Sequence, residues 1–125
     1  MPRIVLSLFA LFIVFATPAV SADLQKGMDA AMRGDFATAL REWKPLAEQG
    51  DAKAQFNLGV MYDNGRGVVQ NFALAHMWWN IAASKGHKDA GLNLDVLEKK
   101  MTSEDVHKAQ RLARICLAKD YKYCN

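Results

Sequence analysis

Two stretches of the chain, FATALREWKPLAEQGDAKA at residues 36–54 and FALAHMWWNIAASKGHKDA at residues 72–90, follow one sparse pattern. When residues 36–58 are laid on residues 72–94, nine of the 23 positions are identical and no gap is needed. The shared residues are four Ala and one each of Phe, Trp, Gly, Asn and Leu. A repeat of this length predicts supersecondary units that stack along the chain.

Both copies place their apolar residues at the spacing of an amphipathic α-helix. Each helix is expected to stop at a glycine, Gly50 or Gly86, because glycine readily adopts the left-handed conformation that ends a helix. A second helix is predicted after each glycine, over residues 52–63 and 88–99. Small Ala and Gly side chains beside large aromatic rings indicate helices that pack closely. The sequence therefore predicts helical hairpins that dock on one another.

Residues 52–90, AKAQFNLGVMYDNGRGVVQNFALAHMWWNIAASKGHKDA, resemble the Sel-one-like repeat, a branch of the tetratricopeptide superfamily. The matching residues are Ala54, Leu58, Gly59, Tyr62, Gly65, Gly67, Val68, Ala73, Ala75, Trp79, Ala82, Ala83, Gly86 and Ala90. The upstream residues Gly27, Gly34, Asp35, Phe36, Ala39 and Trp43 are similar to an ordinary tetratricopeptide hairpin with a shorter turn. One departure is Asn71, where the family often has Asp ahead of the second helix.

The resemblance covers about residues 24–94, and residues 101–117 are similar to the closing helix of the family. It implies an all-α fold, a short α-solenoid of two hairpins and a C-terminal capping helical pair. The expected units are repeat one at 24–50, repeat two at 52–86, the third hairpin or cap at 88–119 and a tail at 120–125. Thr102 and Asp105 are suited to cap the last helix, whose apolar stripe is predicted to pack inward.

The first 22 residues have the layout of a secretory signal peptide. A basic start with Arg3 is followed by an apolar run at residues 4–16 and a small-residue sequence that ends at Ala22. The apolar run is short against the roughly 20 residues that span a bilayer, so cleavage after Ala22 is preferred to a retained anchor. The expected product is a single domain of residues 23–125 in the periplasm of a bacterium or outside the cell.

The formal net charge of the whole chain is +3 at neutral pH, and its excess of basic residues lies in the C-terminal part. From Lys99 onward there are seven basic and three acidic residues. These cations suit an acidic partner or the solvated face of a capping helix, and the second interpretation is sufficient. Tyr121 and Tyr123 flank only one of these cations, Lys122, and the others have no aromatic residue interleaved with them, so a nucleic-acid partner is not predicted.

The two cysteines, Cys116 and Cys124, are even in number in a chain expected to reach an oxidising compartment. They allow an intramolecular disulfide, two free thiols or pairing with another chain. The intramolecular disulfide is preferred, and it would fold the tail back onto the last helix. The spacing fits neither a redox Cys-x-x-Cys pair nor a zinc site.

No catalytic residue, metal site or cofactor is predicted. The three histidines, His76, His87 and His107, form no His-Glu-x-x-His pattern, and His76 is expected to be partly buried or on the surface. Ser84 and Ser103 are not followed by the Lys of a Ser-x-x-Lys motif. The glycines around Arg66 are interpreted as turn residues, because no strand precedes them.

Stacked hairpins present a concave face lined by the first helix of each pair, which suits a protein partner. The predicted groove residues are Lys53, Phe56, Asn57, Val60, Asp63, Asn64 and Asn93. Asn57 and Asn93 occupy equivalent places in the repeat, and the resemblance implies that such asparagines can hold the backbone of an extended peptide. The alternative is that both are solvated or cap local turns. Trp78 is expected to be exposed and to serve as an aromatic anchor.

These observations predict a scaffold for protein–protein interaction in the cell envelope. Two alternatives stay open. One is an envelope hydrolase or a binder of cell-wall fragments such as a penicillin-binding protein, which would need a deep pocket with converging ionisable groups. The other is a stabilising or inhibitory subunit of a larger complex.

Overall fold

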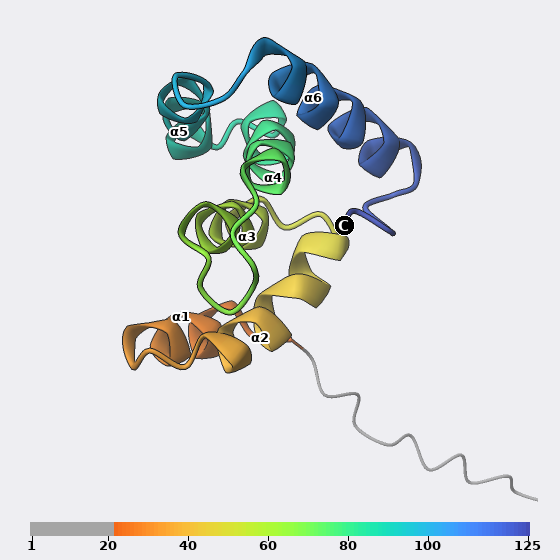
Figure 1. Cartoon of the computed structure of the whole chain (residues 1–125). Helices are drawn as coiled ribbons and strands as arrows, with labels where there is room; N and C mark the ends of the chain where they lie inside the picture. The colour runs from red at the N-terminus through yellow and green to blue at the C-terminus, as the bar shows by residue number, and fades with distance from the viewer. Residues whose placement is uncertain (1–21) are drawn as a thin grey trace, which may run out of the picture.

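A computed structural model describes residues 22–125, which form six α-helices and no strand (Figure 1). The helices are α1 Leu24–Met32, α2 Phe36–Glu48, α3 Ala52–Asn64, α4 Phe72–Ser84, α5 Lys88–Glu98 and α6 Ser103–Ala118. The predicted all-α architecture is confirmed, whereas the leader falls on residues outside the described part. None of the six helices combines the length and the apolar character that a membrane span requires.

Each helix starts at a side chain that accepts a hydrogen bond from the first turn, as expected for N-caps. These caps are Asp23, Asp35, Asp51, Asn71, His87 and Thr102. Asn71 accepts from the Leu74 N–H at 3.0 Å, so an amide oxygen does here what a carboxylate would do. Gly50 and Gly86 follow α2 and α4 with φ of 92° and 90°, which confirms their predicted role as helix stops.

The first two helix pairs are closed in the same way. The Trp43 ring lies on Gly27, and its indole N–H donates to the Leu24 carbonyl at 3.2 Å. The Trp79 ring lies on Gly59, and its indole N–H donates to the Phe56 carbonyl at 3.0 Å. A Cβ atom on either glycine would stand 2.3 Å from the facing indole, so only glycine lets the two helices approach this closely.

The last pair departs from this arrangement. α6 packs across α4 and makes little contact with α5, so α5 and α6 lie on opposite sides of α4 (Figure 1). This placement corrects the expectation that Trp78 is exposed. Its side chain is 2% exposed and lies in the core cluster that also contains Ala113 and Cys116 of α6. Trp78 is buried because α6 covers the face of α4 that a simple two-layer hairpin would leave open.

His76 is also more buried than expected, because α5 covers it. Its side chain is 1% exposed, and its Nε2 lies 2.8 Å from Oε1 of Glu98 at the end of α5. The ring Nδ1 has no hydrogen-bond partner within the described residues. The contact ties the C-terminal end of α5 to α4 and so fixes the position of α5.

A disulfide between Cys116 and Cys124 confirms the predicted pairing. It brings the C-terminal tail back towards the second and fourth helices. Lys85 lies 4.5 Å above the Tyr121 ring and donates to the Gly50 carbonyl. Three tail residues, Asp120, Tyr121 and Tyr123, have φ between 51° and 63°, a conformation that is uncommon without glycine. The bond therefore holds a tail whose backbone would not favour this shape by itself.

Candidate interaction groove

Two hollows lie on the side of the molecule formed by α1, α3 and α5, the first helices of the three pairs. The first hollow, between α1 and α3, is lined by Met28, Ala31, Met32, Phe36, Trp43, Phe56, Asn57, Val60, Met61 and Arg66. The second hollow, between α3 and α5, is lined by Val60, Asp63, Asn64, Trp79, Asn93, Val96, Leu97 and Lys100. Both are open to solvent, and they share Val60. They therefore form two neighbouring parts of one groove.

The first hollow is mainly apolar and has a volume of about 330 Å³. Its floor is the ring of Trp43, which the closing of the first hairpin positions. Met28 and Met32 border it from α1, and Met32 is 82% exposed. Flexible thioether side chains adapt to differently shaped apolar groups. This volume is at the lower end of typical ligand pockets, which fits one or two side chains of a partner.

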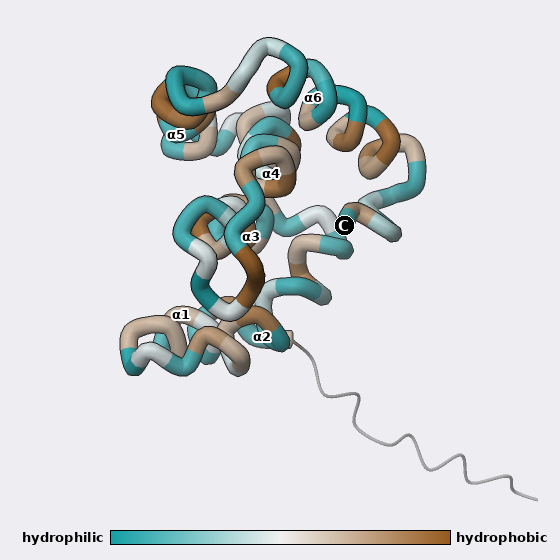
Figure 2. The backbone as a smooth tube through the Cα atoms, viewed as in Figure 1, coloured by the Kyte–Doolittle hydropathy of each residue, from teal (hydrophilic) through white to brown (hydrophobic). Residues whose placement is uncertain are grey.

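Arg66 is the one charged residue that lines the first hollow. Its guanidinium lies 5.4 Å from the centre of the Phe36 ring, a distance suited to a cation–π contact. The turn that carries it passes close to Phe36 and Met61, since a Cβ on Gly67 would lie 3.0 Å from the first and 2.7 Å from the second. Figure 2 shows a hydrophobic stretch in the turn between α3 and α4. Val68 of this turn packs against the core. The Gly-rich turn therefore holds a cation at the rim of an apolar hollow.

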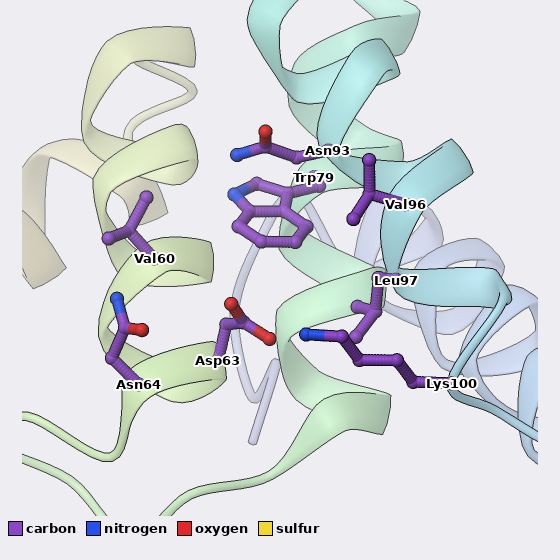
Figure 3. A pocket seen from close by; sticks show the side chains of 8 residues that line it. All are labelled: Val60, Asp63, Asn64, Trp79, Asn93, Val96, Leu97 and Lys100. Carbon is purple, nitrogen blue, oxygen red and sulfur yellow. The ribbon is translucent and has the colours of Figure 1, made fainter.

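The second hollow is smaller, about 150 Å³, and more polar. In Figure 3 the Asn93 amide lies above the Trp79 ring, which forms the floor. The charged ends of Asp63 on α3 and of Lys100 in the turn after α5 point towards one another. This hollow offers two amides, a carboxylate and an ammonium group to an occupant, beside apolar side chains such as Val60 and Val96.

The predicted groove residues are distributed over both hollows. Phe56, Asn57 and Val60 line the first. Val60, Asp63, Asn64 and Asn93 line the second. Lys53 is exposed and lines neither. Asn57 reaches towards α1, where its amide nitrogen lies 3.6 Å from the sulfur of Met28.

Among residues 22–125, three groups have shifted pKa values, and none of them lines either hollow. Burial raises the pKa of the Tyr62 hydroxyl. Hydrogen bonds from Thr38 lower the pKa of the Asp35 carboxyl. The Asp23 backbone N–H, with the Lys26 ammonium beside it, lowers the pKa of the Glu42 carboxyl. These groups support the helix pairs, and the groove itself holds only Asp63, Lys100 and Arg66 as ionisable residues.

The helix pair α3–α4, with Gly59 under Trp79 and the turn through Gly65 and Gly67, is also recognised by comparison with known families. The family model of the Sel1 repeat matches residues 52–87. The chain carries a Sel1 repeat. Neither a curated protein nor a solved structure matches the chain at a significant level.

The Sel1 repeat contributes residues to both hollows, because α3 stands between them. Several lining residues outside the predicted set come from its neighbours, namely Met28 and Met32 of α1, Val96 of α5 and Lys100 in the turn after α5. A signal for Val96 was present, since Val60 and Val96 follow Asn57 and Asn93 at the same spacing. The α1 residues were harder to find, because the shorter turn of the first pair shifts the register of the repeat.

Within residues 22–125, no three His, Cys, Asp or Glu side chains lie close enough to hold a metal ion.

Proposed function

We propose that this protein is an interaction module that holds an extended segment of a partner protein along the groove formed by α1, α3 and α5. Sel1 repeats generally mediate protein–protein interaction, which supports a protein as the partner. The openness of both hollows also favours a polypeptide that crosses them over a small molecule enclosed on all sides.

The observation that carries this proposal is the placement of Asn57 and Asn93. They stand at equivalent positions of α3 and α5, one in each hollow. An asparagine side chain offers both a donor and an acceptor, so it can pair with the N–H and C=O groups of an extended backbone. Two such amides at one repeat spacing suit a segment that runs across the helices.

The two hollows also suggest which side chains the partner supplies. An apolar side chain fits the first hollow, and Arg66 at its rim favours an acidic neighbour. A polar residue suits the second hollow, where Asp63 and Lys100 offer both charges. The same composition argues against the hydrolase alternative, because no Ser, Thr, Cys or His side chain lines either hollow.

The compartment is part of the proposal. The leader at residues 1–22 and the Cys116–Cys124 bond are both suited to an exported protein. We place the interaction in the cell envelope, after removal of the leader. N-terminal sequencing of protein recovered from the host envelope tests this step, with Asp23 as the expected first residue.

The groove is tested by combining Asn57→Ala with Asn93→Ala. The protein serves as bait for affinity capture from the envelope, and the recovered partner is then titrated against the variants. Loss of two side-chain-to-backbone hydrogen bonds is expected to weaken binding at least about tenfold. Gln49→Ala, an exposed amide outside both hollows, is the matched control. Unchanged affinity in the double variant would exclude the groove as the binding surface.

A further inference from the structure

Among the acidic residues that form ion pairs in the described structure, Glu42 has the least exposed side chain. Its side chain, which extends from α2, is 10% exposed. Its Oε2 accepts a hydrogen bond from the Asp23 backbone nitrogen at 3.0 Å, and its Oε1 lies 3.3 Å from Lys26 Nζ. A buried carboxylate requires compensation for the loss of its hydration. Lys26 supplies this only in part, because its side chain is 62% exposed.

The Asp23 nitrogen is also the atom that cleavage after Ala22 would change. In the uncut chain it is an amide with one N–H. After hydrolysis of the Ala22–Asp23 peptide bond, water supplies the hydroxyl of the new Ala22 carboxyl group, and the Asp23 nitrogen becomes the α-amino group. At neutral pH it takes up a proton and becomes an ammonium with three N–H donors.

We propose that Glu42 is a built receptor for the new N-terminus, so that removal of the leader converts a neutral hydrogen bond into a salt bridge that locks α1 onto α2. The inference rests on the processing step of the proposed function. Charge-assisted hydrogen bonds are about twice as strong as neutral ones. A side chain nine-tenths buried also holds the carboxylate where salt screens it less than on the surface.

The dipole of α1 and two neighbouring charges act on the pair formed by the Asp23 ammonium and the Glu42 carboxylate. A positive group at the start of α1 opposes the helix dipole, so the new ammonium would destabilise α1 in the absence of an acidic partner. The Asp23 carboxylate, which caps α1 by accepting from the Lys26 N–H at 3.1 Å, offsets part of this charge. The Lys26 ammonium competes for Glu42 from the solvent side. Glu42 is therefore the group that makes a charged end at Asp23 favourable.

The lock would also position one wall of the groove. α1 is a short helix that carries Met28 and Met32 into the first hollow. Glu42 lies next to Trp43 in the sequence, and the Trp43 indole N–H bonds to Leu24. Removal of the leader thus strengthens the contact of Asp23, which directly precedes Leu24, the residue whose carbonyl accepts from the Trp43 indole.

The test is a cycle of four proteins, each expressed with the native leader. The changes are Glu42→Gln, which keeps the shape and an acceptor but removes the charge, and insertion of one Gly after Ala22. The insertion leaves the Asp23 nitrogen an amide after processing and moves the ammonium one residue away. Mass spectrometry establishes the first residue of each protein, and circular dichroism follows thermal unfolding.

The processed native chain is expected to melt about 5 °C above the Gly-inserted chain. In the Glu42→Gln background this difference should disappear. The salt bridge with Glu42 would raise the pKa of the Asp23 α-amino group in the folded protein above its value of about 8 in the unfolded chain. The stabilisation is therefore complete below about pH 8 and is lost as the pH rises through the pKa of the folded state. The native chain should therefore lose stability between about pH 8 and pH 10 relative to the Gly-inserted chain, and this comparison remains available if Glu42→Gln does not fold.

The outcomes separate the inference from the proposal on which it rests. A native protein that does not begin at Asp23 overturns the processing step and the receptor together. A protein that begins at Asp23 but melts no higher than the Gly-inserted chain leaves export intact and overturns the receptor. A difference that persists in Glu42→Gln also overturns it, because the carboxylate would then not be the group that binds the ammonium.

Discussion

Trp43 and Trp79 each close a helix pair over a glycine, whereas the α5–α6 pair has neither residue at the corresponding places. Trp43 and Trp79 are the eighth residues of α2 and α4, and the eighth residue of α6 is Gln110. The place of Gly59, the eighth residue of α3, is occupied by Asp95 in α5. Without the glycine and the indole, α6 does not close over α5. It packs on α4 instead and is fastened by a disulfide.

This difference shows which of the repeated residues determine the architecture. A glycine alone is not sufficient, because Gly91 in α5 has no atom near the position that its Cβ would occupy. The glycine matters where an indole lies on it and donates a hydrogen bond back to the first helix. The groove depends on this pairing, because the two indoles are the floors of the two hollows.

The largest expected effect is on the tryptophans. Trp79→Ala removes a buried ring and its hydrogen bond to Phe56, and it should lower the free energy of unfolding by about 3–5 kcal/mol. Gln110→Ala, at the corresponding place of α6, should change it by less than about 0.5 kcal/mol. Urea unfolding followed by circular dichroism measures both. Similar losses in the two variants would mean that the third pair relies on this position as much as the second.

Alanine in place of the glycines of α3 and α5 should have effects of opposite sign. Gly59→Ala puts a Cβ 2.3 Å from the Trp79 ring and should destabilise by about 3 kcal/mol, the upper end of the range for overpacking. Gly91→Ala meets open space and should stabilise by about 0.5–1 kcal/mol, because alanine is the better helix former. Thermal melts of the two variants suffice. A stable Gly59→Ala protein would show that the close approach of α3 and α4 is not required.

The disulfide should matter less for the whole molecule and mainly for its C-terminal end. Replacing Cys116 and Cys124 together by Ala removes a bridge between residues eight apart, which is expected to cost about 2 kcal/mol because release of the left-handed tail offsets part of the loss. Limited proteolysis should then cut the tail first, while the two Trp-closed pairs stay protected. Simultaneous cleavage throughout the chain would contradict a local role.

Much of this fold could be predicted from the repeat, because identical residues at a fixed spacing reveal the parts that pack. The spans of α2, α3 and α4, the caps and the glycine stops follow from local patterns. The position of α6 could not be predicted in this way, since it depends on which face of α4 is free after α3 and α5 have packed. The apolar run of Met77, Trp78 and Trp79 was the available signal, because a helix that is hydrophobic on all sides is buried on all sides.

The groove was predictable on α3 and α5, whose register the repeat defines, and not on α1. Asn57 and Asn93 stand out by spacing, but the contribution of α1 requires knowing that Gly27 corresponds to Gly59. The turn with Arg66 was correctly interpreted as a turn. Its position beside Phe36 depends on a contact between residues distant in the sequence, which periodicity does not describe.

The most direct test of the groove is a magnetic resonance titration of the isotope-labelled protein with the recovered partner segment, following the side-chain amide signals of Asn57 and Asn93. The account predicts that both signals shift together and saturate at one concentration, because a single extended segment crosses both hollows. Shifts confined to α6 or the C-terminal tail, with both amides unchanged, would contradict it.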